Sequence, residues 1–272
     1  MRKLSPMTVG TVLLSICVLF LGCDDDIVES TNRPAYIDGF AYLSPGCVLY
    51  AEVRGQGGMD PGLDSVRMGD SLCYIDLFSY FSIADPVYTV HVIETEGDYM
   101  FASGDNAVIT FYGENGTGTA SLRILDLDLD APVIVSPESG EILSPGEHPT
   151  IVWNRVDNAE WYAVYYYWQI DSLGLARGEH VFAYAFDTTY PIIGDYPDEY
   201  LNFINVLVCS CTGPNPGQAV GNIDGDYAVG KIVSYTNVAV VQLMGEGNMN
   251  INSQVRPNLS SQDIVRRVLE RP

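Results

Sequence analysis

The chain has 272 residues and a formal net charge of −22 at pH 7, with 47% hydrophobic, 11% aromatic and 18% charged residues. A surface this acidic repels phosphate backbones, which argues against nucleic acid as a partner. The aromatic content argues against a disordered acidic chain, and the length fits one or two folded domains.

The N-terminal segment has the order of a secretory signal peptide. Arg2 and Lys3 come first, and an apolar run from Val9 to Leu21 follows. This run is shorter than the roughly 20 residues that a membrane span needs. Gly22, Cys23 and three aspartates end the segment.

The residues Leu21, Gly22 and Cys23 resemble the lipobox of bacterial lipoproteins, although Phe20 stands where that family usually has leucine. The resemblance implies cleavage after residue 22, lipidation of Cys23 and a membrane-anchored location outside the cytoplasm, at either the inner or the outer membrane. Loss of residues 1–22, with two basic and no acidic residues, would take the net charge from −22 to −24. The alternative is an uncleaved anchor helix in which Cys23 is an ordinary thiol.

Four cysteines remain beyond this segment, an even number for an oxidising compartment. Pairing Cys47 with Cys73 is the simplest disulfide. Cys209 and Cys211 lie two residues apart, so on a strand they point to the same face and are too far apart for relaxed disulfide geometry. We interpret these two as buried thiols.

Residues 23–35 are predicted to form a tether, and from residue 36 onward β-prone runs alternate with turn signals. Short strands with regular turns and no long period of 3.6 residues predict an all-β fold of antiparallel β-sandwiches. The segment Asp126 to Pro132 has the character of a domain joint, because Pro132 favours an extended residue before it. We therefore expect two sandwich domains, 36–130 and 131–250, and a tail, 251–272. The expected strands are 36–43, 47–53, 72–83, 87–93, 107–112, 120–125, 133–135, 150–154, 161–170, 180–185, 189–192, 200–211 and 232–243.

The second half contains Ala131-Pro132, the run Thr150 to Trp153, the run Ala159 to Val164, Thr188 to Tyr190 and a long strand from residue 200. Over about residues 131–243 these features resemble a fibronectin type III-like or related immunoglobulin-like module. The resemblance implies that Trp153 and Tyr162 lie in the core between two sheets. It says little about function, because this sandwich serves many functions.

The tail predicts a short C-terminal helix. Ser260 is a suitable N-cap, with Asp263 three residues later, and apolar residues from Ile264 to Leu269 share one face. A helix of this length is marginal alone, so it needs a surface to pack against.

Two short motifs have the letters of known functional signatures. Gly69 to Leu72 has the letters of the GDSL esterase signature, with Ser71 as nucleophile. That family supplies a histidine three residues after an aspartate, which none of the three histidines here has, so we interpret the motif as a turn entering a strand. The segment Asn222 to Asp226 mimics the start of an EF-hand loop, but Asp224-Gly225 is better interpreted as a hairpin turn.

Asp126, Asp128 and Asp130 alternate with Leu127 and Leu129. On an extended chain the three carboxylates share one face, where a cation would relieve their repulsion. One interpretation is a structural Ca²⁺ site at the domain joint, loosely similar to a cadherin linker. The other is a solvated edge without any cofactor.

The run from Trp161 to Trp168 is the most aromatic part of the chain. If Tyr162 faces the core, then Trp161, Tyr165 and Tyr167 point outward. Exposed, they would form an aromatic strip suited to sugar rings or a protein partner. The alternative is that the first domain or the tail helix covers them.

Together these patterns predict a membrane-anchored extracytoplasmic lipoprotein that acts as a non-catalytic interaction module for protein or glycan. The alternative is a calcium-stiffened structural spacer of a cell-envelope assembly. A GDSL-type esterase is the remote alternative. An exposed aromatic strip would favour the first function, and a covered strip would favour the spacer.

Overall fold

The computed structural model describes residues 34–44, 46–55, 60–76, 87–93, 101–172, 175–193, 201–218, 221–246 and 259–270. The predicted signal peptide, the lipidation site Cys23 and most of the predicted tether lie outside these residues. The described chain is largely antiparallel β-sheet with one short C-terminal helix, so the predicted all-β fold is confirmed. Residues 34–272 form one compact unit.

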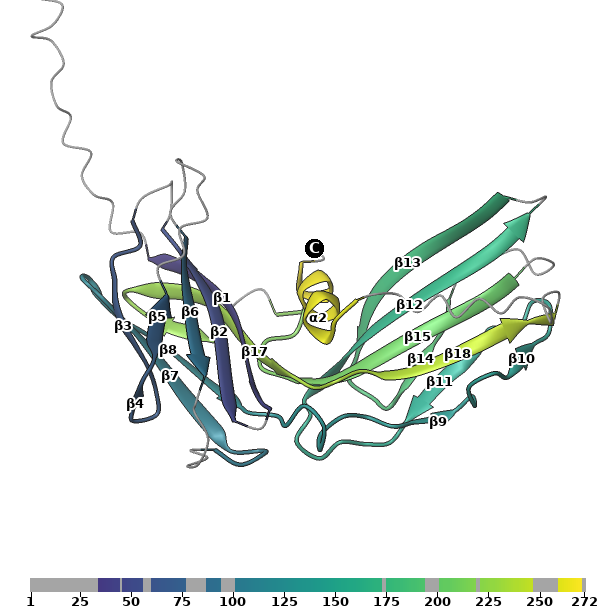
Figure 1. The fold of residues 1–272 in the computed structure, drawn as a ribbon, viewed down its shortest axis with the longest axis horizontal. Helices are drawn as coiled ribbons and strands as arrows, with labels where there is room; N and C mark the ends of the chain where they lie inside the picture. The colour runs from purple at the N-terminus through teal and green to yellow at the C-terminus, as the bar shows by residue number, and fades with distance from the viewer. Residues whose placement is uncertain are drawn as a thin grey trace, which may run out of the picture. The chain divides into compact units, whose positions relative to one another are not determined.

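The first eight strands of the chain, together with β16 and β17, form one part of a 15-stranded sheet (Figure 1) in the order β4-β3-β7-β8-β16-β17-β1-β2-β6-β5. The pairings in this part are antiparallel except that of β1 with β17, which is parallel. The strands are β1 Ala35–Leu43, β2 Cys47–Arg54, β3 Leu63–Met68, β4 Ser71–Leu72, β5 Tyr74–Asp76, β6 Val87–Ile93, β7 Asn106–Gly113, β8 Gly116–Arg123, β16 Ile223–Gly225 and β17 Ala228–Tyr235.

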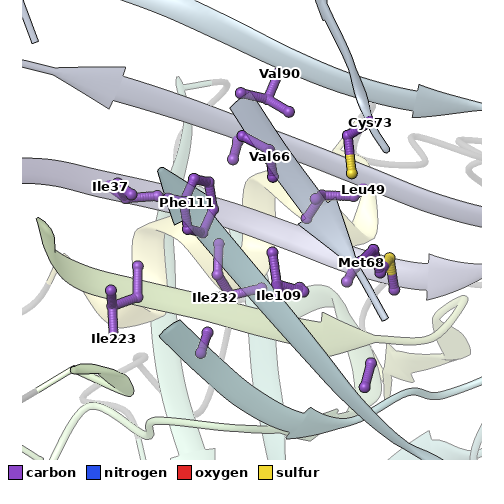
Figure 2. Close-up of a cluster of buried hydrophobic side chains, with 14 of the residues drawn as sticks. Ile37, Leu49, Val66, Met68, Cys73, Val90, Ile109, Phe111, Ile223 and Ile232 are labelled. Atoms are coloured by element: carbon purple, nitrogen blue, oxygen red, sulfur yellow. The ribbon is translucent and has the colours of Figure 1, made fainter. Parts of the chain in front are cut away.

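The core of this sheet follows the period of two expected for a half-buried strand. On β2 alternate side chains, including Leu49, are buried. Figure 2 shows Ile37 and Leu49 gathered with Ile109 and Phe111, which come from β7. Strands from distant parts of the sheet thus cover one another and exclude water from a shared core.

Cys47 and Cys73 both lie in this core, but they are thiols and no disulfide joins them. The Cys47 thiol instead points at the Met68 sulfur, 3.6 Å away. The predicted 47–73 disulfide is therefore not formed. The two cysteines act as small apolar side chains that fill the core.

The second half packs two sheets face to face. One is the rest of the 15-stranded sheet, with β10 Ile142–Leu143, β12 Trp161–Ser172, β13 Leu175–Ala185, β15 Leu201–Thr212 and β18 Ala239–Gly245. The other holds β9 Ile134–Ser136, β11 Thr150–Trp153 and β14 Thr189–Pro191. The rings of Trp153 and Tyr162 meet edge to face in the core that these strands enclose, with centroids 5.2 Å apart. Both residues therefore lie where we predicted.

The boundary predicted between residues 130 and 131 does not divide the sheets. Residues 223–235 were expected in the second domain, but they form β16 and β17, which pair with β8 and β1. At its far end β17 also pairs with β15 through Tyr235 and Cys211, so the two halves share one hydrogen-bonded sheet. The close approach of β17 to β1 requires glycine at position 230, because a Cβ there would lie 1.9 Å from the Ile37 carbonyl oxygen.

Helix α2, Ser261–Leu269, packs against β12, β13 and β17 (Figure 1). Ser260 and Asp263 form a capping box, as predicted, and the hydrogen bond from Ser260 holds the pKa of Asp263 below its usual value. Ile264, Val265 and Val268 are buried in a third core, which contains residues of the outer faces of β1, β12, β13, β15 and β17. The helix therefore owes its stability to this surface.

Candidate functional site

The aromatic run of β12 is not an exposed strip. Trp161 and Tyr165 are 1% and 0% exposed, and Tyr167 is half-buried. The Trp161 indole N–H donates to the Gly213 carbonyl oxygen at 3.1 Å. The alternation was predicted correctly, because Tyr162 and Tyr165 belong to different cores. The exposure that we expected of the strip is wrong for Trp161 and Tyr165, because α2 and neighbouring strands cover their face.

A phenol–imidazole pair lies at the border of the covered area. Tyr165 Oη and His180 Nδ1 are 2.7 Å apart and share a hydrogen bond. The Tyr167 ring stacks on the His180 ring with centroids 4.5 Å apart. Burial raises the pKa of Tyr165 to about 12, with a smaller contribution from Tyr167. This phenol therefore stays neutral at any physiological pH.

The surface that α2 leaves open lies on β13 and the residue that follows it. His180, Phe182 and Tyr184 alternate along β13, and Phe182 is 7% exposed because α2 covers it. The Arg267 guanidinium lies 5.3 Å from the centre of the Phe182 ring. Beyond the helix, Tyr184 is 38% and Phe186 59% exposed.

Tyr184 and Phe186 form a pair on this open surface. Their rings meet edge to face, with centroids 5.6 Å apart and planes at 84°. A Cβ on Gly217 would lie 3.4 Å from the Tyr184 hydroxyl, so the loop of residues 213–218 runs beside that ring. The loop is held by its own hydrogen bonds, among them Gly217 N–H to Asn215 Oδ1 at 2.9 Å.

Strand β13 also presents a long backbone edge. All 11 of its residues pair with β12 in unbroken register, from Tyr162 opposite Ala185 to Ser172 opposite Leu175. Among the described strands, β13 pairs with β12 alone. We call the combination of this edge with Tyr184 and Phe186 the β13 surface.

The predicted metal residues form a turn instead of an extended strand. Asp126 Oδ1 accepts the backbone N–H groups of Asp128 and Leu129, each at 2.9 Å, and Asp130 Oδ2 accepts the Asp126 N–H at 2.8 Å. The three carboxylates therefore do not line one face, and the extended geometry that we predicted is wrong. The short polar side chains hydrogen-bond nearby backbone instead.

Further bonds tie this turn to distant segments. The Asn158 amide donates to Asp130 Oδ1 at 3.3 Å, the Ser103 hydroxyl donates to Asp130, and the Asn237 amide donates to Asp128 Oδ1 at 2.8 Å. Over the described ranges, no group of three or more His, Cys, Asp or Glu side chains gathers as metal ligands do. The calcium site stays a prediction.

The remaining motifs take structural positions. Ser71 begins β4 directly after a turn at Gly69-Asp70, as the structural interpretation predicted. Asp224 and Gly225 lie within β16, so the hairpin turn comes later than predicted, after Gly225. Cys209 and Cys211 are buried on one face of β15, and burial raises the pKa of the Cys211 thiol well above its usual value.

The sequence contained a signal for the β13 surface that we did not use. His180, Phe182, Tyr184 and Phe186 alternate as regularly as the aromatics of β12. Alternation identifies a shared face, but only the position of α2 distinguishes Phe182 from Tyr184.

Comparison with protein-family models and with curated proteins found no match for this chain. In the part of the chain that the structure describes, no helix is long and apolar enough to cross a membrane.

Proposed function

We propose that this chain is a membrane-anchored extracytoplasmic lipoprotein. It acts as a non-catalytic interaction module that binds a protein or glycan through the β13 surface. The observation that carries the proposal is the exposed aromatic pair of Tyr184 and Phe186. Aromatic rings bring a large apolar area to an interface at a low cost in conformational entropy.

The location rests on the N-terminal sequence. The basic start, the short apolar run and the Gly22-Cys23 junction support export and lipidation. Each acyl methylene buried in a membrane contributes roughly 0.8 kcal/mol, and an anchor with more than one chain is stable.

Cysteine substitutions test the anchor. Cys23→Ala should abolish fatty-acid labelling of the full-length chain, whereas Cys17→Ala, a matched change inside the apolar run, should retain it. Equal labelling of both variants would contradict lipidation at Cys23.

The binding role is tested by replacing both exposed rings. The double variant Tyr184→Ser/Phe186→Ser should fold normally and lose at least tenfold in affinity for ligands selected from glycan and peptide arrays. Leu72→Ser is the control, because Leu72 is also an exposed apolar residue but lies on β4. A double variant that binds every selected ligand as the native chain does would contradict this role.

A structural spacer is the second candidate function. The covered aromatic run of β12 and the hydrogen bonds that tie the Asp126–Asp130 turn to Asn158 and Asn237 support it. Full complementation of a deletion strain by the Tyr184→Ser/Phe186→Ser variant would favour the spacer over the interaction module.

A further inference from the structure

The edge of β13 has the geometry that an extended chain needs. In an antiparallel pair, alternate N–H and C=O groups of each strand point away from the partner strand. The 11 residues of β13 contain no proline, and their register with β12 has no bulge. Bulges and prolines are two of the devices by which proteins blunt an edge. Figure 1 shows β13 beyond β12 at the border of its sheet.

The side chains around this edge favour a cationic partner. Asp187 is exposed and directly follows Phe186. The faces of aromatic rings attract ammonium and guanidinium groups, and a carboxylate such as that of Asp187 adds a charge-assisted hydrogen bond. The net charge of −22 raises the local concentration of cationic partners and opposes the approach of a second copy of this chain.

We propose that the β13 surface binds an extended, basic segment of a partner protein as an added β-strand, with a Lys or Arg side chain against Tyr184 and Phe186. The proposal rests on the proposed function and narrows its ligand from protein or glycan to one class. Main-chain hydrogen bonds to β13 supply affinity in this mode, and the aromatic pair with Asp187 supplies the preference for a cation.

The test starts from a library of random linear peptides, selected on the full-length chain in detergent micelles and counter-selected on Tyr184→Ser/Phe186→Ser. We expect enriched peptides with Lys or Arg between β-branched residues. Exchange of their basic residues for Glu should weaken binding at least tenfold. The Leu72→Ser chain, as a matched control, should bind the enriched peptides as the native chain does.

Backbone methylation then tests for strand addition. One version of an enriched peptide carries N-methyl groups on its odd-numbered amides, and a second version carries them on its even-numbered amides. The affinities of the two versions should differ at least tenfold, because only one set of amides can face β13. Equal effects of both sets, or enriched peptides without basic residues, would overturn the proposal. An absence of enriched peptides would also overturn it, and glycan binding that needs Tyr184 and Phe186 would then leave the proposed function standing. A dimer of the chain that the double substitution dissolves would show that the occupant is a second copy, and would equally overturn the proposal.

Discussion

The docking of α2 gives the most direct quantitative test of the structure. Ile264 lies on the buried face of α2 and is fully buried in the same core as Tyr165 and Phe182. Substitutions of Ile by Ala in a core cost about 2–5 kcal/mol, since they remove apolar contacts and leave a cavity. A nine-residue helix has little stability alone, so α2 cannot compensate for the loss internally. We therefore expect Ile264→Ala to lower the free energy of unfolding by about 3 kcal/mol.

Two readouts separate local release of α2 from global loss of stability. Urea unfolding followed by circular dichroism measures the free energy of unfolding, and an apolar dye measures exposure of the surface under the helix in the native state. The matched control is Glu270→Ala, because Glu270 is exposed at the end of α2 and should change the free energy by at most about 0.5 kcal/mol. If Ile264→Ala changed neither readout more than the control does, the packing of α2 described above would be wrong.

The remaining predictions concern the polar turn, the buried phenol and the thiols. Asp130→Ala should lower the free energy of unfolding by about 1–3 kcal/mol, because it removes the acceptor of the Ser103 hydroxyl and of the Asp126 N–H; a loss under about 0.5 kcal/mol would contradict this. The pKa of Tyr165 is about 12 in the folded chain and near its ordinary value of 10 in the unfolded chain. The neutral phenol therefore contributes its full share of the free energy of unfolding below pH 10, and this share is lost as the pH rises through 12. The stability advantage of the native chain over Tyr165→Phe, measured by urea unfolding, should therefore shrink between pH 9 and about pH 12, and a constant advantage would refute the raised pKa. In the unfolded chain of residues 24–272, a thiol reagent should find four reactive thiols, and fewer would show that a disulfide forms; in the native chain it should react slowly with the buried Cys47, Cys73, Cys209 and Cys211.

The sequence was most informative where local chemistry decides the structure. The capping pair of Ser260 and Asp263 placed the start of α2 correctly, because a cap acts over a few residues. The alternation in β12 assigned Tyr162 and Tyr165 to opposite faces, since side chains on a strand alternate by stereochemistry. β-Branched runs between turn residues likewise predicted an all-β fold.

Local reasoning failed where a side chain had two competing partners. An extended chain would have placed Asp126 and Asp130 on one face, but their carboxylates accept backbone N–H groups of the same segment and stabilise a turn. The same limit applies to Cys47 and Cys73, because an even number of cysteines does not say whether two thiols adopt disulfide geometry.

The sequence by itself determined the all-β character, the alternating faces of β12 and the start of the helix. It missed β3, β10 and β16, and it merged parts of β17 and β18 into one expected strand. Only the tertiary structure decided what covers each face. The return of β17 to pair with β1 joins segments from opposite ends of the described chain, and no local pattern encodes such a contact. The position of α2 buries Phe182 and leaves Tyr184 exposed, although both belong to one alternating series. Burial depends on the neighbours that folding brings together, and for this reason the candidate binding surface lies on β13 rather than on the more aromatic β12.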